Sequence, residues 1–128
     1  MFVKMLRKLS KTIKMFFNED NEKPEVFTKN LITNKNVHIG DYTYGFPHVY
    51  IWTNRYSLYI GKFCSIAENV RILVEGNHRT DFITTYPLDY WVEGVSPNPN
   101  NYSLKGGVNI GNDVWIGEGA LILPGISI

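Results

Sequence analysis

Residues 110–128 read IGNDVWIGEGALILPGISI, and an isoleucine stands at every sixth position of this stretch, Ile110, Ile116, Ile122 and Ile128. A second run keeps the same six-residue step, with Ile60, Ile66 and Ile72. An α-helix repeats every 3.6 residues and a flat strand every two, so this step fits neither. It is typical of a chain that turns a corner every six residues and points one aliphatic side chain inward on each side.

The repeat predicts an all-β solenoid in which three sides close one coil of a triangular prism. An earlier and less regular stretch begins at Ile39, whose sixth-residue successors are Gly45 and Ile51. We expect the solenoid to span residues 36–128. Because the period still runs at the last residue, we expect the solenoid either to be truncated at its C-terminus or to have its end covered by another chain. A small residue follows the inward side chain and suits a tight corner with little room for Cβ. These small residues are Gly40, Gly61, Ala67, Gly111 and Gly117.

Residues 76–106 interrupt the period and predict an extended loop. The segment contains an aromatic and proline-rich run from Tyr86 to Tyr102 and ends at a pair of glycines. Excursions of this length without a core of their own are uncommon in compact domains and more often functional than idle.

The N-terminal segment carries an excess of basic residues. Thirteen Lys and Arg residues against twelve Asp and Glu give a formal net charge of +1, but five of the basic residues fall in residues 1–17. Apolar residues recur there at spacings of three and four, which predicts an amphipathic helix. Its apolar stripe packs on the body or on another subunit, or lies on an anionic membrane surface. Residues 18–35 are predicted to be a linker.

Composition also excludes several classes of protein. The near-zero net charge gives no global basic field, so we expect no nucleic-acid partner. No run of eighteen apolar residues is present, which argues against a membrane span. Lys and Arg recur regularly near the N-terminus, so this segment lacks the apolar core of a signal peptide. A single cysteine, Cys64, excludes an internal disulfide framework. We therefore expect a cytoplasmic protein.

Three stretches carry a resemblance to a known family: IGKFCSIAE at residues 60–68, GNHR at 76–79 followed by TYP at 85–87, and GNDVWIG at 111–117. In this order, with a long loop beginning at the histidine, they resemble the hexapeptide-repeat acyltransferases, and within them the xenobiotic acetyltransferase branch of chloramphenicol and streptogramin O-acetyltransferases. The resemblance covers roughly residues 36–128. It implies a left-handed parallel β-helix, a homotrimer with active sites between neighbouring prisms, and acetyl-CoA as the co-substrate.

By this resemblance His78 is the general base. An acceptor hydroxyl is a poor nucleophile at neutral pH, so a neutral imidazole must take its proton as the oxygen attacks the thioester. Cys64 need not act as a nucleophile, and core packing is the better interpretation of this residue.

Further site residues rest on weaker matches. Tyr44 and Tyr86 are expected at the acceptor pocket, with an ordinary packed or exposed tyrosine as the alternative for Tyr44. Trp115 either packs at the subunit interface or contacts the cofactor. The pantetheine arm could approach the backbone at Gly117, Gly119 and Ala120, although the fold itself needs small residues at corners.

The three histidines also suggest an alternative function, that of a metal-dependent β-helix enzyme such as the carbonic anhydrases that use this architecture. His38, His48 and His78 stand ten and thirty residues apart, which does not match clustered ligands, so no metal is predicted. The favoured function is acetyl transfer to a hydroxyl of a sugar or polysaccharide precursor, ahead of an antibiotic. The alternative from another class is a non-catalytic β-helix scaffold or interaction module, or an inactive truncated acetyltransferase.

Overall fold

A computed structural model describes residues 26–96 and 105–128 of the chain. The predicted N-terminal helix over residues 1–17 lies outside these residues. The described elements are η1 (Thr28–Asn30), β1 (Val37–Ile39), β2 (His48–Tyr50), β3 (Leu58–Ile60), β4 (Ser65–Ile66), β5 (Arg71–Leu73), α2 (Leu88–Trp91), β6 (Val108–Ile110), β7 (Trp115–Ile116) and β8 (Leu121–Ile122).

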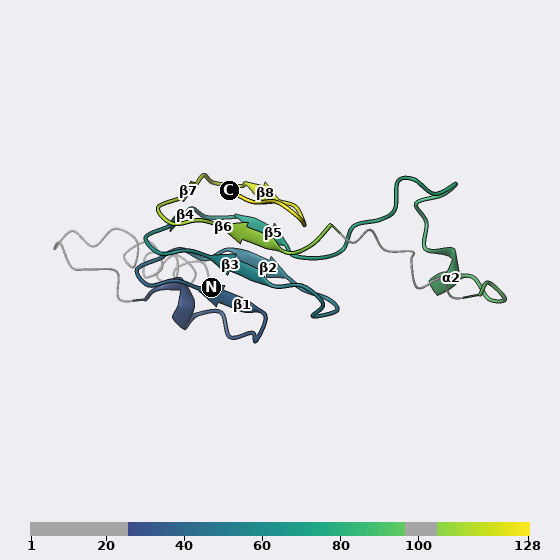
Figure 1. Cartoon of the computed structure of the whole chain (residues 1–128), viewed down its shortest axis with the longest axis horizontal. Helices are drawn as coiled ribbons and strands as arrows, with labels where there is room; N and C mark the ends of the chain where they lie inside the picture. The colour runs from purple at the N-terminus through teal and green to yellow at the C-terminus, as the bar shows by residue number, and fades with distance from the viewer. Residues whose placement is uncertain (1–25, 97–104) are drawn as a thin grey trace, which may run out of the picture.

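The strands form three parallel sheets, which the chain visits in a fixed order (Figure 1). Sheet 1 contains β1, β3 and β6, sheet 2 contains β4 and β7, and sheet 3 contains β2, β5 and β8. A parallel bridge between Tyr44 and Ser65 adds the first passage of the chain to sheet 2. Each circuit therefore runs from sheet 1 to sheet 2 to sheet 3, and strands pair between circuits. Over the described residues, parallel sheets with almost no helix are compatible with the predicted β-helix.

The core consists of the inward side chains of these circuits, and it confirms the six-residue pattern. Each isoleucine of the two runs except the last is at most 6% exposed. The register places Ile60 beside Ile110, Ile66 beside Ile116 and Ile72 beside Ile122. One aliphatic side chain per sheet thus stacks on its counterpart in the next circuit, which removes apolar surface from water.

The first circuit departs from the six-residue step. Tyr44 pairs with Ser65 and His48 with Arg71. The step from sheet 2 to sheet 3 is therefore four positions in this circuit and six in the next. Val49, instead of Ile51, consequently lies opposite Ile72. The shortcut passes through Gly45, which has a φ of +116° and where a Cβ would lie 2.0 Å from the carbonyl oxygen of Ile66. Only glycine fits this position.

The corners also differ in detail from the sequence prediction. The lack of space is confirmed at Gly40 and Gly61, where a Cβ would lie 2.6 Å and 2.5 Å from backbone atoms of the next circuit. The left-handed turn itself, however, does not fall on the small residue. It falls two residues after the small residue, which is the third residue after the inward isoleucine. Positive φ angles are found there at Tyr42, Phe63, Asn69, Asp113 and Gly119.

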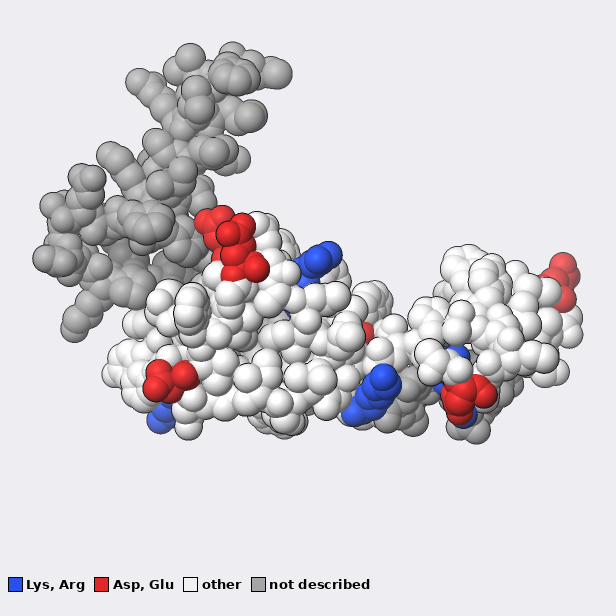
Figure 2. Space-filling model, turned by 90° about the horizontal axis from the view of Figure 1, so that it is seen from above, with Lys and Arg blue, Asp and Glu red and all other residues white. Residues whose placement is uncertain are grey.

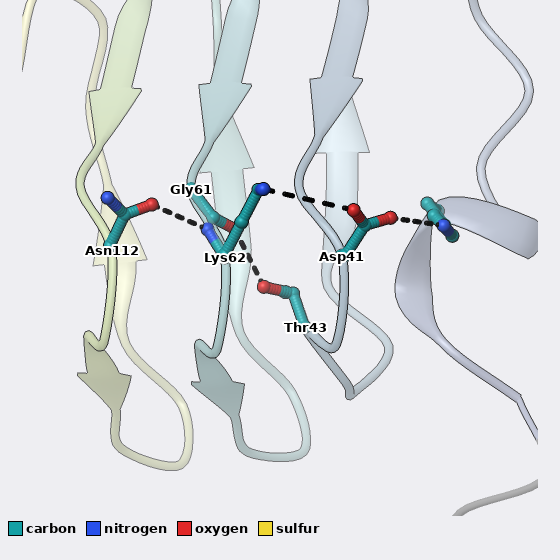
Figure 3. Close-up of polar contacts among 6 residues, drawn as sticks. Asp41, Thr43, Gly61, Lys62 and Asn112 are labelled. Atoms are coloured by element: carbon teal, nitrogen blue, oxygen red, sulfur yellow. Dashed lines mark hydrogen bonds and ion pairs between the residues drawn. The ribbon is translucent and has the colours of Figure 1, made fainter.

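Polar side chains link the circuits at the corner between sheets 1 and 2 (Figure 3). The buried hydroxyl of Thr43 donates to the Gly61 carbonyl oxygen over 2.7 Å. The main-chain amide of Lys62 donates to the side-chain oxygen of Asn112 over 2.8 Å, while its ammonium lies 4.0 Å from Asp41. Asp41 is also paired with Lys29, and the hydrogen bond from that ammonium lowers the pKa of the Asp41 carboxyl. The three circuits are thus held in register by hydrogen bonds across this corner.

Within the predicted linker, η1 packs against the first circuit. The amide of Thr28 donates to the carbonyl oxygen of Thr43 over 2.9 Å, and its buried hydroxyl donates to that of Gly45 over 2.9 Å. These bonds satisfy backbone groups at the edge of the stack that would otherwise lack partners.

The loop that follows β5 leaves the sheets and carries α2 away from them (Figure 1). Charged side chains on the face seen from above form small separate groups with uncharged surface between them (Figure 2). Over residues 26–96 and 105–128, no helix has the length and apolar character needed to cross a membrane.

Candidate active site

His78 lies at the exit from sheet 3 into the loop, and its imidazole is held by the main chain. The Nδ1 atom is 2.8 Å from the carbonyl oxygen of Thr85. A carbonyl oxygen can only accept, so in the neutral ring Nδ1 carries the proton and Nε2 keeps a lone pair. The side chain is exposed, which leaves Nε2 accessible to a substrate. This tautomer is the one that can accept a proton at Nε2.

Glu75, three residues before His78, is buried in a ring of hydrogen-bond donors. Its Oε2 accepts from the Trp52 amide at 3.1 Å, from the Thr53 amide at 2.5 Å and from the Thr53 hydroxyl at 2.8 Å. Its Oε1 accepts from the amides of Arg55 at 2.8 Å and Tyr56 at 3.2 Å. Burial alone would raise the pKa of this carboxyl, but the bonds from Thr53, Tyr56 and Arg55 outweigh it and the pKa lies below its ordinary value.

An aromatic side chain closes one side of the turn between Glu75 and His78. Gly76 has a φ of +100°, and a Cβ there would lie 2.6 Å from the ring of Trp52. Trp52 is in turn stacked on Tyr50, with ring centroids 5.9 Å apart. Gly76 thus supplies both the left-handed turn and the space that the indole occupies.

On the other side of His78, Arg79 is fixed within the loop. Its Nε donates to Asp81 over 2.8 Å, and its guanidinium lies 4.0 Å above the centroid of the Phe82 ring. The hydrogen bond from Arg79 lowers the pKa of Asp81. These contacts order the first turn of the loop beyond the histidine.

Tyr86 directly follows Thr85, so the structure brings this predicted acceptor residue next to the carbonyl that holds His78. Its amide donates to the Thr84 hydroxyl over 3.1 Å, and its side chain is exposed. The loop exposes apolar side chains on both sides of Tyr86: Ile83 before it is fully exposed, and Tyr90 and Trp91 after it are about two-thirds exposed. Such a surface is typical of a binding or subunit interface.

A second group of predicted residues lies on the outer face of sheet 2. Tyr44, Ser65 and Trp115 are paired in sequence across this sheet, so their side chains form one column with the small serine in the middle. Trp115 is 82% exposed. The main chains that carry the two aromatic side chains are therefore two strand spacings, or about 10 Å, apart, with Ser65 between them.

The three small residues predicted to face the cofactor follow Trp115. A Cβ added to Gly117 or Gly119 would meet no described atom within 4 Å, and Gly119 has a φ of +70°. Ala120 is half-buried and packs against the core. The backbone at the two glycines is thus open to approach from outside the stack.

The two groups of predicted residues lie at opposite ends of the circuits. Sheet 2, with Tyr44 and Trp115, faces away from the end at which the loop with His78 and Tyr86 departs (Figure 1). A single chain therefore does not bring the predicted cofactor residues to its own histidine.

The remaining candidates are placed elsewhere. Cys64 is fully buried in the core, and its Sγ is 3.1 Å from the carbonyl oxygen of Gly111, which confirms the packing interpretation. His38 is stacked on Tyr59 outside sheet 1, and His48 lies on the outer face of sheet 3. In the described part of the chain, no three His, Cys, Asp or Glu side chains gather in a group that could hold a metal ion.

Sequence reasoning misses Glu75, Trp52 and the role of the Thr85 carbonyl. The acidic residue has a signal in the chain, because it directly follows the apolar run that ends at Val74. The contacts of Trp52 and of a main-chain carbonyl have no such signal, since they join segments far apart or use atoms common to all residues.

Comparisons with known proteins show which enzymes the chain is similar to. A scan against protein-family models finds no match. The chain is, however, 50% identical over 74 residues to a probable macrolide acetyltransferase of Lysinibacillus sphaericus, covering 54% of this chain and 41% of the relative. It is 34% identical over 114 residues to a chloramphenicol acetyltransferase of Klebsiella aerogenes, covering 76% and 54%. A chloramphenicol acetyltransferase of Agrobacterium fabrum is 41% identical over 75 residues, covering 56% and 36%.

These relatives confirm the resemblance to the xenobiotic acetyltransferase branch of the hexapeptide-repeat acyltransferases. The chain spans about half the length, or less, of the curated relatives that it matches.

Proposed function

We propose that this protein is an acetyl-CoA-dependent O-acetyltransferase, built on a left-handed parallel β-helix, with His78 as the general base. The observation that carries the proposal is the hydrogen bond between Nδ1 of His78 and the Thr85 carbonyl. It leaves Nε2 as the accessible acceptor on an exposed ring, at the entrance to a loop rich in aromatic side chains. The names of the relatives support acetyl transfer.

The reaction is a direct transfer. The acceptor hydroxyl donates its proton to Nε2 while its oxygen attacks the carbonyl carbon of the acetyl thioester. The tetrahedral intermediate carries the negative charge on the former carbonyl oxygen, which backbone N–H groups would stabilise. The carbon–sulfur bond then breaks, and the departing CoA sulfur takes the proton back from the imidazolium. No covalent enzyme intermediate forms, in keeping with the burial of Cys64.

For the acceptor, the relatives change the order of the two candidates. The sequence alone favours a sugar hydroxyl over an antibiotic, but the relatives are named for a macrolide and for chloramphenicol. We therefore propose an antibiotic hydroxyl as the acceptor, with a sugar hydroxyl as the second candidate. Tyr86 and the exposed aromatic residues of the loop offer flat apolar surface to either class.

The complete site is proposed to form between subunits of a homotrimer. A neighbouring chain that presented the column of Tyr44 and Trp115 to the loop would bring cofactor and acceptor residues to His78. The exposed apolar side chains of the loop would be covered in the same step. The pantetheine arm would then pass along Gly117 and Gly119, where the backbone is open.

The test is acetyl transfer by the purified 128-residue chain from acetyl-CoA to a panel of chloramphenicol, a macrolide and a hexose. The rate is measured from the release of the CoA thiol. Transfer to either antibiotic that is lost in His78→Ala supports the proposal. Equal activity of wild type and His78→Ala rejects the base assignment. A protein that binds no CoA by calorimetry is instead the non-catalytic scaffold.

A further inference from the structure

We propose that Glu75 is a positioning residue of this site, whose carboxylate fixes residues 52–56 against the start of the loop and thereby sets the place of His78. The proposal rests on the function proposed above and adds a residue to it. Glu75 touches no substrate in this scheme, because its side chain is buried beneath residues 52–56.

The first observation is the saturation of the carboxylate. Four main-chain amides and one hydroxyl, all from residues 52–56, donate to its two oxygens at 2.5–3.2 Å. An ionised carboxylate has about four lone-pair sites, so this side chain is fully used by one segment. The lowered pKa of Glu75 is consistent with the ionised form being the one that the amides bind.

The second observation is the position in the chain at which residues 52–56 contact Glu75 and its neighbour. The last main-chain bond of the strand pair, from Val74 to Tyr50, is followed at once by Glu75 and by the left-handed turn at Gly76. The amide of Trp52 binds the carboxylate, and the ring of the same residue packs on Gly76. One segment therefore contacts the chain at two successive residues, Glu75 and Gly76, which lie three and two positions before His78.

The third observation is that the imidazole is fixed from the opposite direction. Thr85, seven residues further along the loop, holds Nδ1 through its carbonyl oxygen. The direction of Nε2 depends on both supports: the main-chain position set by Glu75 and the ring rotation set by Thr85. Loss of the first leaves the ring on a backbone that is free to shift, and small displacements of a reacting group lower rates steeply.

Glu75→Gln tests the proposal, since it keeps the shape but turns an NH2 group toward amides that can only donate. We expect kcat with acetyl-CoA and chloramphenicol to fall about 10- to 100-fold, with the KM for acetyl-CoA unchanged. The ¹⁵N signals of the His78 ring should shift in the same variant. Thr53→Val, which removes a single donor, should produce smaller changes in the same direction in a protein that folds. Glu68→Gln, at an exposed carboxylate, is the matched control and should change neither readout.

The outcomes separate this inference from the proposed function. If His78→Ala remains active but the His78 ring signals respond to Glu75→Gln, the base assignment is wrong and the positioning of His78 by Glu75 holds. Unchanged kcat and unchanged ring signals in folded Glu75→Gln and Thr53→Val overturn the inference. A fall in stability alone, with kcat and the ring signals unchanged, overturns it as well, because it shows a purely structural role.

Discussion

The Nδ1 atom of His78 and the carbonyl oxygen of Thr85 are 2.8 Å apart, although the two residues stand seven positions apart in the chain. This contact selects one tautomer of a neutral imidazole and aims its free nitrogen away from the loop backbone. A histidine that packed as an ordinary surface residue would need no such partner. This hydrogen bond therefore supports Nε2 of His78 as a candidate proton acceptor.

The first prediction concerns His78 itself. Replacement by Ala or Gln should lower kcat/KM for the acetyl acceptor about 100- to 10,000-fold, the range in which general bases contribute. Initial rates of CoA release, measured on the wild type and on both folded variants, check this point. Equal rates in the wild type and the variants contradict the assignment.

The second prediction concerns the space at the corners. Gly61→Ala places a Cβ 2.5 Å from the carbonyl oxygen of Gly111, and backbone cannot move aside as a flexible side chain can. We expect a loss of roughly 1–3 kcal/mol in the free energy of unfolding. Gly117→Ala, which meets no described atom within 4 Å, is the matched control and should leave stability nearly unchanged. Urea denaturation of the two variants makes the comparison, and equal losses would count against the stacking of circuits.

The third prediction concerns the core. Ile72 is completely buried between Val49 and Ile122 in sheet 3, so Ile72→Ala should cost about 2–5 kcal/mol of unfolding free energy. Leu121 is next to Ile122 in sequence but points outward and is half exposed. Leu121→Ala should therefore cost much less than the core variant. Thermal or urea unfolding measures both, and the reverse order would show that the inward and outward faces are misassigned.

The fourth prediction concerns acid stability. Because the pKa of Glu75 is lower in the folded chain than its ordinary value of 4.5, the ionised carboxylate stabilises the fold. This contribution is fully present above the unfolded value and is lost as the pH falls through the lower, folded value. Urea midpoints should drop over this acidic window in the wild type. The drop should be smaller in Glu75→Gln, which has no carboxylate to protonate there, and an identical pH dependence in both proteins would refute the role of the charge.

Features of the fold that depend on neighbours in the repeat can be predicted from the sequence, whereas features that depend on contacts between distant segments cannot. The six-residue step correctly identifies the inward side chains of the second and third circuits, because each position in a repeat has the same neighbours. It fails in the first circuit, where Gly45 lets the chain pass from sheet 2 to sheet 3 in two fewer residues. It also places the turn on the small residue after the isoleucine, whereas Tyr42 and Phe63 adopt the left-handed turn two residues later. Small residues signal both close packing and turns, and sequence alone does not separate the two.

The site shows the same division. The motif around His78 is visible in the chain, and so is the class of enzyme that it resembles. The support around the histidine is not, because Glu75 and residues 52–56 are about twenty residues apart and meet only when two circuits stack. Most of the donors that they use are main-chain amides, which every residue but proline possesses.

By itself, then, the sequence determined the period of the chain, the inward isoleucines of its second and third circuits and the candidate chemistry of one histidine. These are local properties, fixed by the spacing of apolar residues and by a short motif. The tertiary structure alone decided which segments hold His78 in place, which tautomer its ring adopts, and that Tyr44 and Trp115 share a face remote from the loop of the same chain. Such features depend on the register of one circuit upon the next, and that register is set by packing and hydrogen bonds between residues distant in sequence.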